Sequence, residues 1–260
     1  MSLDLKWYDS AWLNAYMSAL EIIEKVAPQR LDDFTAAFDC LRTDPSFSVK
    51  KMEGFINPAD LSDLKKTLKA IPREKLELHE LQRFGRFVVH DNPAVTELQN
   101  SLVGTVSDWA GEAVEPSYNF LSFYTHKGVC EPHLDSPSAK WTLDICLDQN
   151  EPWPIQFSQI LSWPEKPTHF SEGWREEIKA DEELHFESAI MDPGDALFFS
   201  GSSQWHYRDP MNAKNGRAFC DLLFLHFMPE GTSELVQAKN WPRIFDIPEL
   251  AQIPGIEKAR

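Results

Sequence analysis

The sequence lacks the features that mark several large classes of protein. Its four cysteines, at positions 40, 130, 146 and 220, include no Cys-x-x-Cys pair, which argues against a zinc ribbon or a thioredoxin-type motif. It has no run of about 20 apolar residues, so we expect no membrane-spanning helix. The opening stretch, MSLDLKWYDS, has no basic start followed by an apolar segment and does not resemble a secretory signal. We therefore expect a cytoplasmic protein with reduced thiols.

Clusters of basic residues are also missing. The chain has 25 Lys and Arg against 41 Asp and Glu, a net charge of −16. Binding to a nucleic-acid backbone needs clustered positive charge, so we expect no nucleic-acid partner. We find no internal repeat and no low-complexity segment. The length of 260 residues suits one domain, and nine Trp with 17 Phe supply a large aromatic core.

The first part of the chain is predicted to be mainly helical. Residues 10–26 carry apolar side chains at helical spacing: Trp12, Ala15, Tyr16, Ala19, Leu20 and Ile23. A second short helix is predicted over 30–42, a strand over 46–55, a strand around 82–89 and a helix around 93–112. Asn57 is a good cap for a further helix, because Pro58 fits its first position and Asp60 its first turn.

From residue 117 onward, short strand-like runs replace the helices. They cover residues 118–124, 142–148, 153–160, 183–191, 195–199, 205–209 and 218–227. The run TLDICLD alternates, with Thr142, Asp144 and Cys146 on one face and leucine or isoleucine on the other. Short strands separated by turn residues predict a β-sandwich or barrel. The segment 161–182, rich in Trp, Pro and Glu, is predicted to be a long loop.

These patterns predict a mainly β fold with flanking α-helices, in which N-terminal helices pack on an antiparallel β core. We expect a single domain over residues 1–260. Within it, residues 1–115 form a mainly helical support region, 116–230 the β core and 231–260 a C-terminal extension.

A histidine and a carboxylate stand two apart in EPHLDSP, residues 131–137. On an extended strand His133 and Asp135 point to one face, as two ligands of a metal would. This composition predicts about one His-x-acid pair by chance, and a second pair is present at His185 and Glu187. The pair alone therefore carries little information, and we interpret His185 and Glu187 as structural. We interpret His226, in the apolar run LLFLHF, as a hydrogen-bonded core residue.

A possible third metal ligand and a possible partner for a carboxylate follow later in the sequence. His206 lies 73 residues after His133, just after a strand and a Gly-Ser turn, and Arg217 lies 11 residues further on. Two histidines and one carboxylate leave open coordination positions, which suits non-haem Fe(II) chemistry with O2. A 2-oxoglutarate co-substrate would fill two of them, and its far carboxylate would need a fixed guanidinium.

This ordered set resembles the Fe(II)/2-oxoglutarate-dependent dioxygenases, most closely the prolyl-4-hydroxylase-like group. The likeness covers roughly residues 117–228. It rests on YNFLSFYTHKGVCEPHLDSP, on TLDICLD, on PGDALFFSGSSQWHYRDP and on GRAFCDLLFLHF, in that order along the chain. The resemblance implies a double-stranded β-helix core, of the jelly-roll or cupin-like kind, that binds Fe(II) and 2-oxoglutarate.

The resemblance also implies roles for single residues. It assigns His133, Asp135 and His206 to the iron and Arg217 to the far carboxylate of 2-oxoglutarate. Tyr124 matches a tyrosine that often binds the same carboxylate. Arg208 stands two residues after His206, on the same side of the strand, so it competes with Arg217 for this role; we place Arg217 first.

The predicted reaction is hydroxylation of an unactivated C–H bond, with release of succinate and CO2. In relatives that halogenate, the carboxylate position holds Gly or Ala, so Asp135 favours hydroxylation; desaturation or ring closure could use the same ligands. We expect a small-molecule substrate, an amino acid or a derivative. The alternatives are a peptide or protein side chain, another metal-dependent cupin-like reaction, and a jelly-roll binding protein without oxygenase activity. The charge of −16 disfavours a nucleic-acid demethylase.

Overall fold

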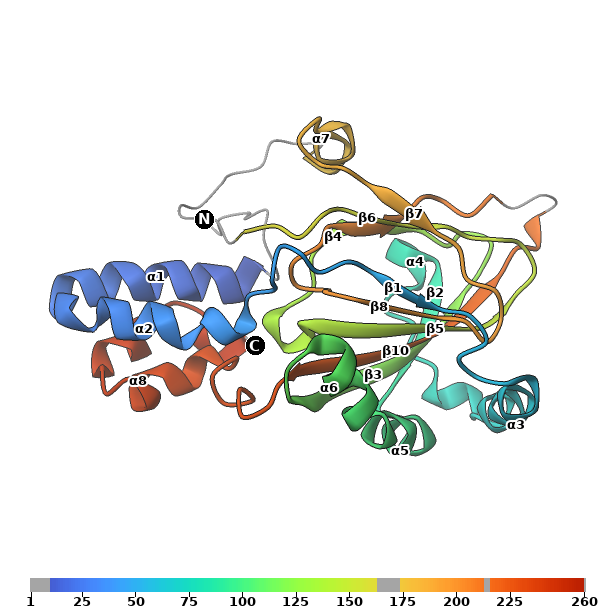
Figure 1. Ribbon diagram of the computed structural model, residues 1–260, viewed down its shortest axis with the longest axis horizontal. Helices are drawn as coiled ribbons and strands as arrows, with labels where there is room; N and C mark the ends of the chain where they lie inside the picture. The colour runs from blue at the N-terminus through green and yellow to red at the C-terminus, as the bar shows by residue number, and fades with distance from the viewer. Residues whose placement is uncertain (1–9, 163–173, 213–215, 260) are drawn as a thin grey trace.

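Two antiparallel β-sheets, one above the other, form the centre of the molecule (Figure 1). The computed structural model describes residues 10–162, 174–212 and 216–259. The larger sheet has the order β1 (Lys50–Met52), β8 (Ala196–Phe199), β5 (Trp141–Gln149), β10 (Cys220–Pro229), β3 (Val114–Tyr124) and β2 (Arg86–His90). The smaller sheet has the order β4 (Cys130–His133), β9 (His206–Arg208), β6 (Ile155–Phe157) and β7 (Glu187–Ala189).

The alternation of β5 separates the two faces of the larger sheet, as the sequence predicts. Leu143, Ile145 and Leu147 face outward, where three helices cover the sheet. Thr142 faces inward, toward the space between the sheets, and Cys146 packs among inward-facing residues. Because side chains alternate along a strand, one sequence run supplies both an apolar outer face and a partly polar inner face.

The three covering helices are α3 (Pro58–Lys69), α5 (Pro93–Ser101) and α6 (Val103–Ala110), below the larger sheet in Figure 1. Helix α3 begins as predicted, because the side chain of Asn57 accepts hydrogen bonds from the backbone N–H groups of Ala59 and Asp60. The helix predicted over 93–112 is interrupted at Leu102, so two short helices replace it.

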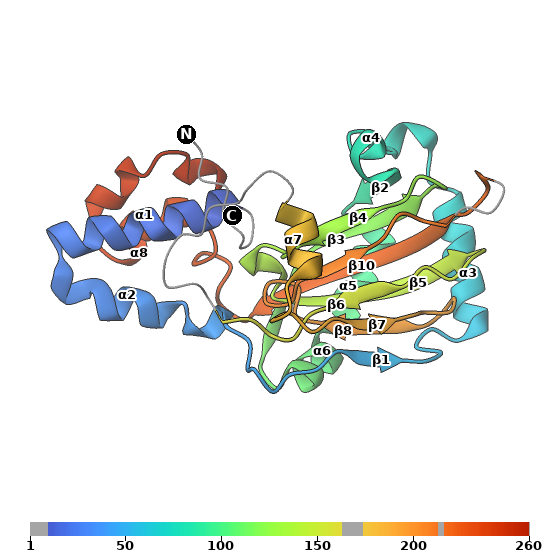
Figure 2. The ribbon, with the colours of Figure 1, turned by 90° about the horizontal axis from the view of Figure 1, so that it is seen from above.

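A helical lobe extends from one end of the β core, as both views show (Figures 1 and 2). It contains α1 (Ser10–Val26), α2 (Leu31–Ala37), α8 (Trp241–Ile244) and short 3-10 turns between residues 238 and 258. The predicted stripe of α1 is buried, with Trp12, Ala19 and Ile23 fully inside. Trp12 meets Trp241 edge-on at 5.7 Å, so the C-terminal extension returns to the N-terminal helices.

Several local predictions differ from the structure. The strands predicted over 46–55 and 153–160 are only three residues long. Residues before β2 form a short helix, α4 (Leu81–Phe84), which ends at Gly85 in the left-handed conformation. The segment predicted as a loop contains α7 (Trp174–Ala180), while residues 163–173 lie outside the described parts of the chain. Within the described residues, no helix combines the length and apolar character needed to cross a bilayer.

Candidate functional site

A cavity of about 630 Å³ opens between the two sheets. Strands β2, β3 and β10 line one side, β4 and β9 the other, and α4 and α7 also contribute. The C-terminal extension reaches it as well, through Lys258. The cavity therefore draws residues from distant parts of the sequence, and it is large enough for a small molecule.

Two histidines and an aspartate come together on its wall. His133 ends β4 and His206 begins β9, and the two residues are direct partners in the strand register. One carboxylate oxygen of Asp135 lies 3.6 Å from Nε2 of His133, and the other lies 3.8 Å from Nε2 of His206. One ligand atom from each of the three lies within 4.8 Å of the others. Within the described residues, no other group of His, Cys, Asp and Glu has this geometry.

Both imidazoles are turned so that Nε2 faces the centre of the group. Nδ1 of His133 lies 2.9 Å from the carbonyl oxygen of Glu131, and Nδ1 of His206 lies 2.9 Å from that of Gln204. A carbonyl oxygen can only accept, so each Nδ1 carries a proton, and Nε2 offers a lone pair when the ring is neutral. Metal-binding histidines are commonly oriented in this way, so the donors present fit a divalent metal ion.

The carboxylate of Asp135 is held in place by two neighbours. Its backbone N–H donates to the carbonyl of Gly201 at 2.9 Å, and the hydroxyl of Thr142 donates to one of its oxygens at 3.3 Å. A Cβ atom at position 201 would overlap with that carboxylate oxygen and approach the Thr142 hydroxyl to 2.7 Å. Burial opposes ionisation of Asp135, but His206 and His133 outweigh it and lower the pKa of the carboxyl. The carboxylate of Asp135 is therefore ionised, and it occupies a space that only a glycine at position 201 leaves open.

The two histidines differ in their tendency to hold a proton. Burial, reinforced by His133, lowers the pKa of His206 to about 4. Burial also acts to lower the pKa of His133, but the nearby Cys130 and Asp135 raise it to about 9. When no cation lies between them, His133 therefore carries a second proton beside the ionised carboxylate of Asp135. A metal ion would take the place of that proton.

Arg208 lies at the inner end of the cavity, two residues beyond His206 on the same face of β9. Its guanidinium binds the carboxylate of Asp144 at 2.9 Å and donates to the carbonyl of Trp153. Both members of this ion pair are at most 4 % exposed. Burial raises the pKa of Asp144 to about 6 despite the opposing effect of Arg208. The pair holds the guanidinium in place about 7 Å along the strand from His206.

A second guanidinium lies beside it. Arg86 on β2 is the direct strand partner of Tyr124 on β3, and it donates to the phenol oxygen of Tyr124 at 2.7 Å. It also binds the carboxylate of Glu80. The ring of Tyr124 meets that of Trp153 edge-on at 4.7 Å, and Trp153 also contacts Arg208. Arg86, Arg208 and Tyr124 therefore form one polar cluster, which we name the inner cradle.

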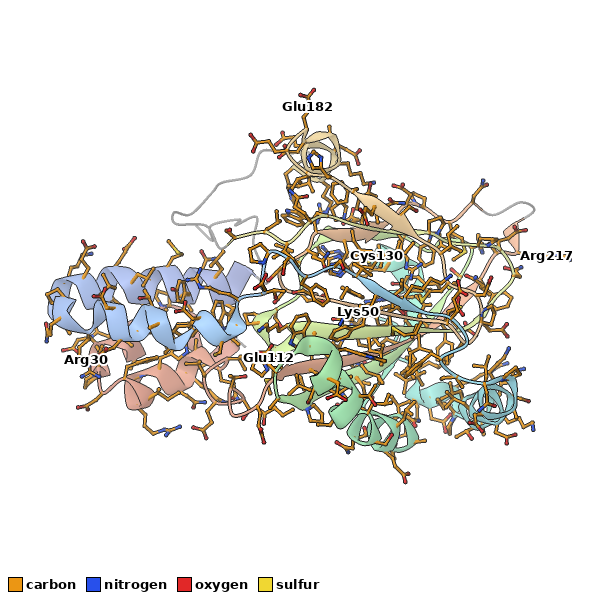
Figure 3. The ribbon with its side chains drawn as sticks, in the orientation of Figure 1. Arg30, Lys50, Glu112, Cys130, Glu182 and Arg217 are labelled. Atoms are coloured by element: carbon orange, nitrogen blue, oxygen red, sulfur yellow. The ribbon has the colours of Figure 1, made fainter. Side chains whose placement is uncertain are left out.

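Arg217 does not reach this cavity. It is exposed, it does not line the cavity wall, and Figure 3 shows it at the outer edge of the β core. Strand β10 begins only at Cys220, so Arg217 precedes the part of the strand that faces inward. The structure therefore does not bring Arg217 to His133, Asp135 and His206, whereas Arg208 lines the same cavity as these three residues.

Aromatic rings line the cavity between the inner cradle and the outer end. Tyr118 and Phe120 come from β3, and Phe224 and His226 from β10. His226 lies 4.2 Å from Tyr118 and 5.6 Å from Phe120, measured between ring centroids. Phe120 stacks on Phe224 at 4.8 Å. We call these four residues the aromatic wall.

Helix α7 contributes to the outer part of the cavity. Trp174 lies 6.0 Å from Trp205, and Arg175 forms an ion pair with Glu131 of β4 at 2.8 Å. All four residues line the cavity. The segment expected to be a loop therefore supplies an aromatic and a charged side chain to the site.

Several lining residues were not anticipated from the sequence. Arg86 follows Gly85 in a short strand, and only its pairing with Tyr124 reveals that it faces inward. His226 is hydrogen-bonded in the interior, as predicted, with Nδ1 3.0 Å from Thr142, but it also lines the cavity. Burial lowers its pKa to about 4.

The second His-x-acid pair of the sequence, His185 and Glu187, is exposed.

Comparisons with known proteins bear on the fold. No family model matches the sequence, and no curated protein matches it. Among solved structures, HygX from Streptomyces hygroscopicus, with nickel, 2-oxoglutarate and hygromycin B bound, has a TM-score of 0.55 at 11 % identity. The match covers 76 % of this chain and 87 % of HygX.

Two proteins of nogalamycin biosynthesis are also similar. The non-haem 2-oxoglutarate-dependent epimerase SnoN has a TM-score of 0.51 at 13 % identity, over 81 % of this chain and 90 % of SnoN. The carbocyclase SnoK has a TM-score of 0.53 at 10 % identity, over 72 % of this chain and 85 % of SnoK. The chain therefore has the double-stranded β-helix fold of the Fe(II)/2-oxoglutarate-dependent oxygenases, with flanking helices, as the sequence predicts.

Proposed function

We propose that this chain, with the fold of the 2-oxoglutarate-dependent oxygenases, is itself an Fe(II)- and 2-oxoglutarate-dependent enzyme acting on a small molecule. One observation carries the proposal: His133, Asp135 and His206 converge within 4.8 Å on the wall of a cavity. Two neutral imidazoles and one carboxylate on one side of a metal leave its other positions open to co-substrate and O2.

The metal would supply the oxidative chemistry when bound with 2-oxoglutarate and O2. The protein supplies the ligands and their orientation. The carbonyl groups of Glu131 and Gln204 fix the two imidazoles, and Thr142 with Gly201 fixes Asp135. Such supporting contacts commonly contribute tenfold or more to metal affinity.

The inner cradle is the proposed site for the far carboxylate of 2-oxoglutarate. Arg208 stands two residues from His206, and a co-substrate that bridges a metal and a cation needs such a separation. Tyr124 and Arg86 add a phenol and a second guanidinium. Both arginines are paired in the structure, so we propose that the incoming carboxylate inserts beside the existing pairs and makes a charge-assisted contact.

The charge of the cavity differs from that of the whole chain. Five cationic side chains line it, Arg83, Arg86, Arg175, Arg208 and Lys258, against the three carboxylates Glu80, Glu131 and Asp135. The net charge of −16 therefore does not describe the site. A cavity of this charge suits the dianionic co-substrate together with a neutral or anionic substrate.

We propose hydroxylation of an unactivated C–H bond, because Asp135 occupies a position that must be vacant for a halide. The substrate would be a small metabolite, an amino acid or a derivative. The similar structures include an epimerase and a carbocyclase, so the ligand set is compatible with other outcomes. Mass spectrometry of the product distinguishes them, since hydroxylation adds one oxygen and epimerisation adds none.

The test begins with anaerobic titration of the protein with Fe(II) and 2-oxoglutarate. A weak visible charge-transfer band is expected for the wild type and for Glu187→Ala, which alters the exposed pair at His185 and Glu187. Asp135→Ala removes one of the three ligands and should abolish hydroxylation coupled to succinate formation. A screen of metabolites and peptides for stimulated succinate formation then identifies the substrate class. If the wild type shows no band at saturating ligands, or if Asp135→Ala keeps full turnover, the proposal is wrong.

A further inference from the structure

One ring nitrogen of His226 is buried without a hydrogen-bond partner in the parts of the chain that the structure describes. The residue is 2 % exposed, and its Nε2 has no hydrogen-bond partner among the described residues. Its other nitrogen, Nδ1, lies 3.0 Å from the hydroxyl of Thr142. The residue also lines the cavity. Buried polar atoms are rarely left without a partner, so an unsatisfied nitrogen beside a cavity indicates a missing ligand group.

The hydrogen bonds around Thr142 determine whether Nε2 of His226 is a hydrogen-bond donor or an acceptor. The hydroxyl has one proton, and the ionised carboxylate of Asp135, at 3.3 Å, is a charged acceptor for it. The hydroxyl oxygen is then left to accept from Nδ1 of His226. The proton of the neutral imidazole therefore resides on Nδ1, and Nε2 presents a lone pair. The missing group must be a hydrogen-bond donor.

The residues around His226 indicate which kind of hydrogen-bond donor would bind its Nε2. Tyr118 and Phe120 pack against the His226 ring, and Phe224 is nearly parallel to it with an interplanar angle of 2°. Apolar rings of this kind favour a ring-shaped, largely apolar molecule. Arg86 lies 5.3 Å above the ring of Phe120, and cationic side chains outnumber carboxylates around the cavity. An ammonium group is therefore disfavoured as the donor to Nε2 of His226, and a hydroxyl group is the better donor to it.

We propose that His226 determines substrate specificity: its Nε2 accepts a hydrogen bond from a hydroxyl group of a ring compound that packs against the aromatic wall. This inference rests on the proposed function, because it names the substrate class of that same cavity. Two hydrogen bonds connect His226 through Thr142 to Asp135. A hydroxyl on Nε2 would therefore bind in the same cavity as the residues that could hold the metal.

The proton position can be measured without turnover. Long-range ¹H–¹⁵N NMR of histidine-labelled protein, loaded with Zn(II) and 2-oxoglutarate, reports the tautomer of each imidazole, and His226→Phe identifies the signal. The expected result is a proton on Nδ1 and a free Nε2. A proton on Nε2 would overturn the proposal, because the cavity would then face a donor. Since no iron chemistry is involved, this result is independent of whether the chain is an oxygenase.

Substrate selection is tested with matched probes: cyclohexanol against methoxycyclohexane, and phenol against anisole. Ligand-observed NMR on the same Zn(II) complex should show about tenfold tighter binding of each hydroxyl compound than of its ether. His226→Phe keeps the ring but removes the acceptor, so this preference should disappear. His226→Gln returns an acceptor oxygen and should recover most of it.

His90→Phe is the matched control, since His90 lies 5.4 Å from Phe120 but uses its Nδ1 on Glu77. It should keep the preference for the hydroxyl compounds. Equal binding of alcohols and ethers by the wild type, an unchanged preference in His226→Phe, or no binding of either series would each contradict the proposal. A charge-transfer band without hydroxyl selection would refute this inference and leave the proposed function standing.

Discussion

Gly201 leaves the space that the carboxylate of Asp135 occupies. The carbonyl of Gly201 accepts the backbone N–H of Asp135 at 2.9 Å, and a Cβ atom at position 201 would overlap with the carboxylate. The contact joins the turn before β9 to the residue after β4, which brings the third ligand to the two histidines. The two positions lie 66 residues apart in the sequence, and local patterns do not connect them.

Gly201→Ala should therefore weaken metal binding. The added methyl group must displace Asp135 or Thr142, and loss of such support typically costs 10- to 100-fold in metal affinity. Titration with Co(II), followed by its visible absorption, measures the change. Gly104→Ala is the control, because a Cβ at Gly104, in α6, meets nothing within 4 Å. Unchanged Co(II) affinity in Gly201→Ala would show that Asp135 does not depend on this space.

Arg208→Lys and Arg86→Lys should weaken binding of 2-oxoglutarate. Lysine keeps the charge but loses the planar fork, so a bidentate contact with a carboxylate is no longer possible. We expect the Kd of 2-oxoglutarate, measured from the charge-transfer band of the anaerobic Fe(II) protein, to rise about tenfold or more in each variant.

Arg217→Lys is the matched control for these two variants. Arg217 is exposed and outside the cavity, so the Kd should stay within about twofold. A large effect at Arg217 with none at Arg208 would mean that Arg217 binds the far carboxylate of 2-oxoglutarate. Thermal unfolding of all three variants separates binding effects from lost stability, because Arg208 is part of a buried ion pair.

Asp221→Asn should stabilise the protein at neutral pH. Burial and the opposing carboxylate of Asp148, its direct strand partner, raise the pKa of Asp221 to about 6. An unfolded chain releases this proton near pH 4. The folded state therefore binds more protons between these values, and the free energy of unfolding of the wild type falls as pH rises through the interval. Asparagine does not ionise and removes this loss.

Urea unfolding at several pH values measures the difference between Asp221→Asn and the wild type. The variant should gain about 1–2 kcal/mol at pH 7, and the gain should shrink toward zero as the pH approaches 4. Asp63→Asn, at an exposed site on α3, should change the free energy of unfolding at pH 7 by only about 0.5 kcal/mol or less. A gain for Asp221→Asn that is the same at every pH would argue against a raised pKa.

Trp241→Ala should destabilise the helical lobe and the β core together. Trp241 is fully buried, and the cluster it belongs to includes Leu134, Trp205 and Met228 from the β core. Removing such a side chain costs about 3–5 kcal/mol. If residues 1–260 form one domain, fluorescence and far-UV circular dichroism should report a single transition at a lower urea concentration.

Ile244→Ala, in the same short helix, serves as the control. Its side chain is among the exposed ones, so stability should change by about 0.5 kcal/mol or less. An early, separate transition in Trp241→Ala, with the β core still folded, would mean that the helical lobe is an independent unit.

Several elements could be predicted from the sequence because local interactions define them. The apolar spacing of residues 10–26 produces α1, and Asn57 with Pro58 begins α3. Alternation along β5 separates its outer and inner faces. In each case the residues that decide the structure are within a few positions of one another, so a short window contains the physical cause.

Part of the candidate site could be predicted from the sequence, and the rest depends on strand pairing. The order of His133, Asp135 and His206 in the sequence indicated a metal centre, but only strand pairing places His206 opposite His133. The choice between Arg208 and Arg217 depended on where β10 begins, and Arg86 entered the site only through its pairing with Tyr124. Sequence spacing does not contain this information, because a shift of one residue in strand register reverses which side chains face inward.

By itself, then, the sequence determined the fold class, the positions of several helices and strands, and the three side chains suited to hold a metal. The tertiary structure alone decided which guanidinium groups reach the cavity, and that α7 and Lys258 help to line it. It also decided that Nε2 of His226 has no hydrogen-bond partner among the described residues. The reason is physical. Periodicity and capping act between neighbours in the chain, whereas a cavity is formed by contacts between strands whose register and endpoints are set by the packing of the whole molecule.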